Sequence, residues 1–334
     1  MASDDTPVLH VPAREIPVPS ALSPEAKGVL SRGLPGAGNG AGTGDGAGGW
    51  PDPSDTAAWK TMIAARDAAV AKMLGGASPN MAADIVDLDL DGVTVYVGVS
   101  HHAAADDGRV LLSLHGGALI MGGGAPCRTS AGMSAASSGV RTWAVDYRMP
   151  PDHPYPTPLD DCVVAYEALL RDHTPGQIIV GGGSAGANLA AALVLRVRDE
   201  GLPMPAAVVL RTPELDLTES GDTFHTLLGI DNILGLLMNV NLLYANGHDL
   251  TDPYLSPLFG DFTKGFPPTI LTSGTRDLFL SNTVRMHRAL RNAGVEAELH
   301  VLEAAPHGAF LGMAPEDREL EQEVSRFMND HWER

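Results

Sequence analysis

Cysteine and basic residues are both scarce in this chain. Only two cysteines, Cys127 and Cys162, occur among 334 residues, and they follow no zinc-type spacing. They therefore predict small buried apolar side chains, not a disulfide framework or a metal site. Lys and Arg number 22 against 41 Asp and Glu, so the formal net charge is −19. Such an acidic surface repels phosphate backbones and anionic lipids, which argues against nucleic-acid and membrane partners.

Long apolar runs are absent as well. The chain has no stretch of about 18 consecutive apolar residues, the length that a bilayer span requires. Its opening residues are acidic where a signal peptide carries basic residues followed by an apolar run. Apolar residues still make up 44% of the chain, as in ordinary globular proteins. We therefore expect a soluble cytoplasmic protein.

The first 81 residues predict helices and no strand. Ser23-Pro24-Glu25 is a helix start, and the helix it begins reaches Leu30. A second helix is expected from Asp55 to about Leu74. Between the two, nearly every second residue of 33–49 is glycine, which predicts a surface loop.

From residue 82 onward, short apolar runs alternate with helical patterns. A hairpin is expected over 84–97, with its turn at Asp91-Gly92. Further strands are predicted at 110–114, 142–146, 178–180, 206–210, 269–271 and 298–302, and helices at 159–171, 187–198, 280–293 and 315–332. This alternation predicts an α/β fold with a mostly parallel central sheet flanked by helices. The core would comprise 82–213 and 266–334, interrupted by a helix-like insertion at 214–265 that is rich in Leu, Ile and Met.

A glycine-rich corner follows the strand predicted at 178–180. Residues 182–186 read G-G-S-A-G and match G-x-S-x-G, in which a sharp strand-to-helix turn exposes the serine, here Ser184. The same corner also matches G-x-G-x-x-G, the dinucleotide fingerprint. That fingerprint belongs in a first βαβ unit, whereas at least four predicted strands precede this corner. The pattern therefore favours a nucleophilic serine over a dinucleotide site.

Five further residues complete a catalytic pattern. Asp277 and His307 each follow the end of a predicted strand, and the chain order serine, acid, histidine is that of α/β-hydrolases. His307 would take the proton of Ser184, and Asp277 would orient the imidazole. Upstream, Gly116 and Gly117 also follow a strand, where glycines allow backbone N–H groups to face a site. With the N–H of Ala185 they predict an oxyanion hole, so the expected chemistry is acyl transfer.

The motifs together resemble those of the hormone-sensitive-lipase-like family of α/β-hydrolases, the bacterial carboxylesterase branch. His115-Gly116-Gly117 is similar to its H-G-G motif, residues 147–161 (YRMPPDHPYPTPLDD) to its Y-R-L-A-P-E stretch, and His307-Gly308 to its terminal H-G-F. Gly183 replaces the family's usual Asp beside the nucleophile, and Ser281 replaces a frequent second acid. The resemblance implies the α/β-hydrolase fold, with a helical cap over Ser184 formed by 1–81 and 214–265.

The resemblance also implies a substrate class. Strings at 213–218 and 252–258 are similar to those of monoterpene ε-lactone hydrolases, and some lactonases of this general kind open large rings such as zearalenone. We therefore expect a serine hydrolase of hydrophobic carboxylic esters or lactones. Apolar residues beside the site are candidate substrate contacts, although each could equally pack the cap onto the core: Met121, Phe224, Leu228 and Leu237.

Two expectations and one alternative complete the interpretation. No cofactor is expected, and no metal, because the adjacent pair His101-His102 lacks ligand spacing. An exposed edge strand near the C-terminus is compatible with a homodimer in this family. The alternative function is a non-catalytic small-molecule-binding module on the same fold. Such modules typically lose the serine or the histidine, and this chain keeps both.

Overall fold

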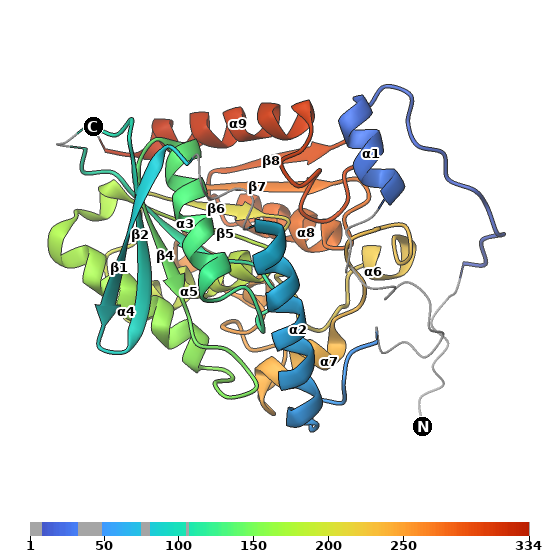
Figure 1. The fold of residues 1–334 in the computed structure, drawn as a ribbon, viewed down its shortest axis with the longest axis horizontal. Helices are drawn as coiled ribbons and strands as arrows, with labels where there is room; N and C mark the ends of the chain where they lie inside the picture. Colours follow the sequence, from blue (N-terminus) through green and yellow to red (C-terminus); the bar gives the residue numbers. More distant parts are fainter. Residues whose placement is uncertain (1–8, 33–48, 75–80, 105–106, 334) are drawn as a thin grey trace.

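An eight-stranded sheet is the centre of the computed structural model, which describes residues 9–32, 49–74, 81–104 and 107–333 (Figure 1). The strands are β1 (Ala83–Leu90), β2 (Val93–Ser100), β3 (Val110–Leu114), β4 (Arg141–Asp146), β5 (Ile178–Gly183), β6 (Ala207–Arg211), β7 (Thr269–Gly274) and β8 (Ala297–Leu302). Their order in the sheet is β1-β2-β4-β3-β5-β6-β7-β8. The first two pairings are antiparallel and the other five are parallel. This is the mostly parallel sheet that the alternation predicts, and its topology is that of the α/β-hydrolase fold implied by the resemblance.

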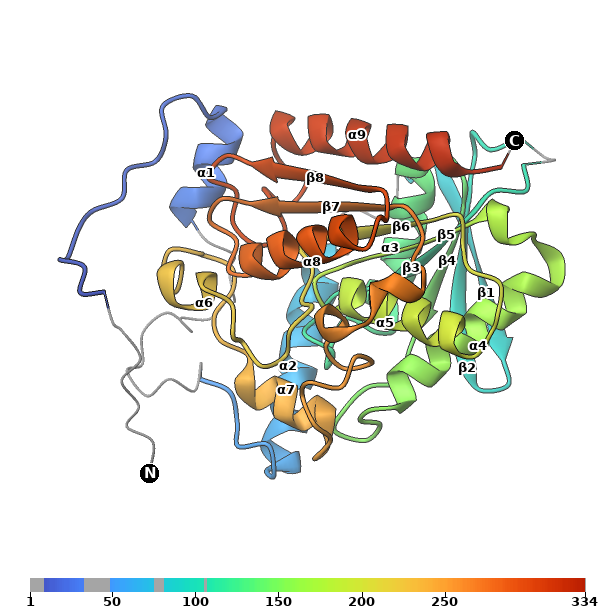
Figure 2. The ribbon, with the colours of Figure 1, turned by 180° about the vertical axis from the view of Figure 1, so that it is seen from behind.

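Helices cover both faces of the sheet (Figures 1 and 2). One face carries α3 (Ala125–Ser138) and α9 (Pro315–His331), and the other carries α4 (Thr157–Asp172), α5 (Ala185–Asp199) and α8 (Leu280–Asn292). The central strand β5 is therefore apolar on both sides, and Ile178, Ile179 and Val180 are fully buried. Alternate residues of that strand belong to the two separate core clusters, which explains its continuous apolar run.

The sequence pattern predicts every core strand and misses one helix. Helix α3 has the sequence APCRTSAGMSAASS, in which small residues hide any apolar stripe. It is buried by close packing instead, since a Cβ at Gly98 of β2 would lie 2.4 Å from the Ala131 carbonyl oxygen. The prediction of a helix-like insertion at 214–265 is wrong in extent. Only α6 (Thr223–Thr226) and α7 (Met238–Ala245) are α-helices there, and most of the insertion is loop.

The two predicted N-terminal helices are present as α1 (Pro24–Arg32) and α2 (Thr56–Leu74). The backbone N–H and hydroxyl of Ser23 both donate to the Glu316 carboxylate at 2.8 Å. Apolar residues of α1 pack against Phe310 and Ala314, in the chain that follows β8. Helix α1 thereby lies against the segment between β8 and α9, beside the β8 edge of the sheet (Figure 1).

Helix α2 packs against the insertion. Trp59 is fully buried with Phe224 and Leu237, so the N-terminal helices and the insertion share one apolar cluster. Of the glycine-rich loop predicted at 33–49, residues 33–48 lie outside the described residues. Within the described ranges, no helix is both long and apolar enough to cross a membrane.

Candidate active site

Ser184 lies on a sharp turn between β5 and α5. Its φ is 56°, a value that residues other than glycine rarely adopt. The turn is possible because glycines allow the strand, the helix and β3 to approach closely. A Cβ at Gly186 would lie 2.0 Å from the Leu114 carbonyl oxygen, and one at Gly182 would lie 2.3 Å from the backbone of Gly186. These small residues hold the serine at the C-terminal edge of the sheet, as the G-x-S-x-G pattern predicts.

The close contact at Gly186 makes a testable prediction. We expect Gly186→Ala to lower the free energy of unfolding by about 3 kcal/mol, because the obstacle is backbone that cannot rotate away. Gly183→Ala is the matched control, since its Cβ would meet nothing nearer than 3.9 Å. Urea unfolding of the two variants and the wild type measures the difference. Equal stabilities would contradict this account of the turn.

Asp277, His307 and Ser184 form a continuous hydrogen-bonded chain. His307 Nδ1 lies 3.0 Å from Asp277 Oδ1, and His307 Nε2 lies 2.8 Å from Ser184 Oγ. Because a carboxylate only accepts, Nδ1 carries the hydrogen, and Nε2 is left to accept from the serine hydroxyl. The three side chains come from the ends of β7, β8 and β5, as the sequence predicts. The arrangement can deprotonate Ser184 as it attacks a carbonyl carbon.

The Asp277 carboxylate is fully buried and fixed by neighbours on its own loop. Its Oδ2 accepts from the Ser273 hydroxyl at 2.7 Å, and Oδ1 accepts from the Phe279 N–H at 3.0 Å. The ring of Phe279 also meets the His307 ring edge to face. These contacts leave the carboxylate and the imidazole little freedom to separate.

A second acid, Asp231 of the insertion, bonds to both the loop after β7, which carries Asp277, and the loop after β8, which carries His307. Its Oδ2 accepts from the Leu278 N–H at 2.8 Å, and its carboxylate lies 3.3 to 3.4 Å from the His307 N–H. The sequence analysis did not single out this residue. In the sequence, the feature that could have pointed to it is an acidic residue within an otherwise mostly apolar stretch, between Ile230 and Ile233. In the structure this acid is buried.

Buried acids shape the electrostatics around His307. Burial alone would lower the pKa of His307, but the hydrogen bond and charge of Asp277, together with Asp231 and Glu214, raise it above its ordinary value. Glu214 lies three residues beyond the end of β6, and burial raises its own pKa to about 8. One of its carboxylate oxygens has no hydrogen-bond partner among the described residues. The sequence analysis missed this residue too, although it follows a strand end as the other site residues do.

The loop after β3 lies against Ser184. A Cβ at Gly116 would be 3.4 Å from that of Ser184, and Gly117 has a φ of 126° that favours glycine. His115 Nδ1 donates to the Gly116 carbonyl at 2.8 Å, and the His115 carbonyl accepts from the Tyr147 hydroxyl at 2.6 Å. Ala185 opens α5, so its N–H has no acceptor within that helix. Gly116 and Ala185 thus flank Ser184 at backbone level, and Gly117 follows Gly116 in the same loop.

A cleft of about 670 Å³ opens from Ser184 and His307 between α3 and α9. Its apolar wall includes Met133, Leu320 and Met328. The four predicted substrate contacts do not line this cleft. Phe224 and Leu237 are buried in the cluster that joins the insertion to α2, Met121 packs against that cluster, and Leu228 is 42% exposed. Their role in substrate binding stays a prediction.

The chain is similar to known hydrolases in sequence. A profile of the family described as alpha/beta hydrolase fold matches residues 111–311. An acetyl-hydrolase of Streptomyces hygroscopicus is 34% identical over 194 residues, which are 57% of this chain and 64% of that protein. An esterase of Acinetobacter venetianus is 33% identical over 202 residues, 58% of this chain and 65% of that protein. The match thus spans just under two thirds of the length of these curated relatives.

Solved structures match over nearly the whole chain. The crystal structure of an esterase E25 superposes with a TM-score of 0.88 and 34% identity, covering 98% of this chain and 99% of that one. An esterase from the bacterial hormone-sensitive lipase family has a TM-score of 0.79 and 28% identity, covering 94% of this chain and all of that one. The overall fold is therefore one that these esterases share.

Proposed function

Because the chain belongs to the α/β-hydrolase fold family, we propose that it is a serine hydrolase that cleaves hydrophobic carboxylic esters through an acyl-enzyme. The observation that carries the proposal is the chain of hydrogen bonds from Asp277 through His307 to Ser184, at 3.0 and 2.8 Å. The esterase names of the relatives support the same substrate bond. The experiment that tests it is the hydrolysis of p-nitrophenyl butyrate by the purified protein, with and without the Ser184 hydroxyl.

In the proposed reaction, Ser184 Oγ attacks the ester carbonyl carbon while its proton moves to His307 Nε2. The N–H groups of Gly116, Gly117 and Ala185 receive the negative charge that forms on the carbonyl oxygen. His307 then gives the proton to the leaving alcohol, which departs from the acylated serine. Water repeats the cycle and releases the acid. Asp277 keeps the hydrogen on Nδ1 and stabilises the imidazolium throughout.

Lactones are included in the proposal. A lactone is an internal ester, so the same attack opens the ring and leaves the alcohol attached to the acyl group. The similarity to monoterpene ε-lactone hydrolases supports such substrates, and a panel of ε-lactones beside linear esters would rank the two classes. We also propose a homodimer formed through β8, which is the C-terminal edge strand of the sheet. Sizing chromatography at several protein concentrations tests that assembly.

The proposed mechanism predicts how the rate depends on pH. Only unprotonated His307 accepts the serine proton, and its pKa is raised above the ordinary value by Asp277 and its acidic neighbours, against the effect of burial. We therefore expect kcat/KM for p-nitrophenyl butyrate to rise with pH and to reach half its maximum above about pH 6.5, the ordinary histidine value. A rate profile at constant ionic strength measures this. A half-maximum below that pH would show that the acids do not act on His307 as proposed.

The size of the cleft predicts the preferred acyl chain. Each methylene buried against its apolar wall contributes about 0.8 kcal/mol, so kcat/KM should rise from acetate to medium-chain esters. The apolar part of the cleft is small, because Asp317, Arg318 and Glu321 also line it, and a long acyl chain lying against these charged groups would cost their hydration. We expect the rate to fall between C8 and C16 p-nitrophenyl esters. A profile that still rises at C16 would contradict this assignment of the cleft.

A further inference from the structure

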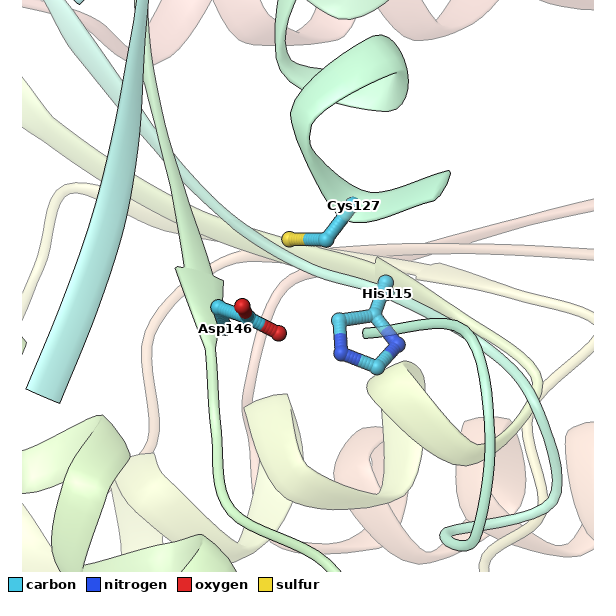
Figure 3. A group of neighbouring side chains, drawn as sticks. All are labelled: His115, Cys127 and Asp146. Carbon is cyan, nitrogen blue, oxygen red and sulfur yellow. The ribbon is translucent and has the colours of Figure 1, made fainter. Parts of the chain in front are cut away.

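Three side chains that the proposed reaction does not use meet behind the loop after β3. His115 follows β3, Cys127 lies in the first turn of α3, and Asp146 ends β4. The β3-α3-β4 crossover brings them to the same edge of the sheet, and Figure 3 shows the three side chains gathered together. One nitrogen, one sulfur and one carboxylate oxygen, one from each residue, lie within 4.8 Å of one another.

One ring nitrogen of His115, Nε2, carries a lone pair that accepts no hydrogen bond from the described residues. His115 Nδ1 lies 2.8 Å from the Gly116 carbonyl, and since a carbonyl only accepts, the hydrogen is on Nδ1. Nε2 is then an unprotonated nitrogen, and it is buried with no hydrogen-bond partner among the described residues. A buried acceptor without a partner costs about 1 to 3 kcal/mol. A backbone carbonyl on one ring nitrogen and a free lone pair on the other is the arrangement in which histidine binds metals.

Asp146 and Cys127 could bind a metal ion without losing strong hydrogen bonds. The Asp146 carboxylate accepts from the Gly124 N–H at 2.9 Å and from the Tyr96 hydroxyl at 3.2 Å, and each oxygen keeps a second lone pair. The fully buried Cys127 thiol makes only a long contact of 3.6 Å to the Val145 carbonyl. On metal binding the thiol would lose its proton to solvent.

We propose that His115, Cys127 and Asp146 form an inhibitory binding site for Zn²⁺. Nitrogen, thiolate sulfur and carboxylate oxygen are the donors that zinc takes in proteins, at 2.0 to 2.3 Å. A contraction of roughly 1 Å brings the three atoms to tetrahedral separations and leaves a fourth position for water. A cleft of about 540 Å³ between α2 and the ends of β2 and β4 reaches Asp146, together with Asp67 and Asp152. Lys60, which pairs with Asp152, and Arg148 also line it, so the three carboxylates leave the lining with a small net negative charge, and the cleft gives a cation a route to the site.

Inhibition follows because two of the proposed ligands fix the 115–124 loop, which carries Gly116 and Gly117. His115 directly precedes Gly116 and Gly117, and the Gly124 N–H is bonded to Asp146, so both ends of the 115–124 loop are tied to the cluster. Drawing the ligands inward shifts the loop amides that face Ser184. Since misplacing such a donor typically lowers a rate 10²- to 10³-fold, even a small shift matters. The ion would regulate the reaction without taking part in it, and the metal-free protein would be the active form. This consequence for the rate rests on the proposed function.

Cobalt and zinc binding test the site directly. Thiolate ligation of Co²⁺ gives a charge-transfer absorption in the near ultraviolet that surface histidines cannot produce. We expect one equivalent of Co²⁺ to give this band in the wild type and in Cys162→Ala, and Zn²⁺ to displace it. We expect no band in Cys127→Ala. Cys162 is the matched control because it is equally buried, in α4, away from the cluster. A wild type without the band, or a band that survives Cys127→Ala, would overturn the site.

Two further measurements complete the test. Asp146→Asn keeps the thiol and should weaken Co²⁺ binding at least tenfold, so it decides the question if Cys127→Ala does not fold. With p-nitrophenyl butyrate, saturating Zn²⁺ should lower the rate at least tenfold in the wild type and in Cys162→Ala, and EDTA should restore it. An unchanged rate with zinc bound would disprove inhibition. If no sample hydrolyses the ester, the proposed function fails, whereas the absorption band still decides whether the metal site exists.

Discussion

Replacing Ser184 with alanine is expected to lower kcat for p-nitrophenyl butyrate by about 10⁴- to 10⁶-fold. Loss of the nucleophile removes the acyl-enzyme route, and what remains is the small rate that oriented backbone amides and bound water provide. The size of the loss reflects that Ser184, His307 and Asp277 act as one unit, linked by two hydrogen bonds. Initial rates under saturating substrate, with a limit set by an enzyme-free blank, give the measurement.

The Ser184→Ala variant needs a control for folding. Alanine keeps the Cβ and can occupy the same turn, so the thermal unfolding midpoint should stay within a few degrees of the wild type. Ser31→Ala removes an exposed hydroxyl in α1, far along the chain from the site, and should keep the full rate. Equal rates above the enzyme-free blank would show that Ser184 is not the nucleophile. If neither protein hydrolysed the ester above that blank, the fold would serve binding alone. The non-catalytic module would then be the better description.

Replacing Asp277 with asparagine is expected to lower kcat by about 10⁴-fold at neutral pH. An amide in this place can donate to His307 Nδ1, which would move the ring hydrogen to Nε2 and leave no acceptor for the serine proton. Asp277 also contributes most of the upward influence on the His307 pKa, through its hydrogen bond and its charge. Its loss should therefore move the acid limb of the remaining activity to lower pH. Both kcat and the pH profile of the variant measure these effects.

Asp231→Asn is the informative comparison for Asp277→Asn. Asp231 contacts the two catalytic loops through the N–H groups of Leu278 and His307, not through the imidazole. We expect it to destabilise the protein by about 1 to 3 kcal/mol while lowering kcat far less than Asp277→Asn does. If the order of the two effects on kcat were reversed, Asp231 and not Asp277 would be the acid that orients His307.

The hydrogen-bonded side chains Ser184, Asp277 and His307 could be predicted because each one follows a strand in a local pattern. The glycines around Ser184 form a recognisable sequence motif because the turn has no room for larger side chains. Asp277 and His307 follow apolar runs, and the carboxyl ends of parallel strands meet at one end of the sheet. The helices α4, α5, α8 and α9 were predictable for a similar reason, because each has an apolar stripe or clear boundaries.

What the sequence does not reveal is decided by packing between distant segments. Asp231 and Glu214 matter because an irregular insertion folds back and buries them beside His307, and no local period marks that event. Helix α3 is built from small residues that allow it to pack closely against β2, so a search for apolar periodicity cannot detect it. Cys127 is correctly predicted as a buried residue. Its neighbours His115 and Asp146 come from two different strands and are invisible from spacing alone.

The contact between Ser23 and Glu316 has a consequence for how the protein is made. The two residues are 293 positions apart, and α1 packs on the segment that follows His307. The ribosome therefore releases α1 long before its partner segment exists, and α1 has to wait until the chain has been made as far as Glu316. A nascent chain halted at the end of β8 would already hold Ser184 and the strands around it but would lack Phe310 and Ala314, the apolar surface on which α1 docks. His307 lies in the same late-made segment, so the hydrogen-bonded chain through Ser184 can form only after that segment has left the ribosome.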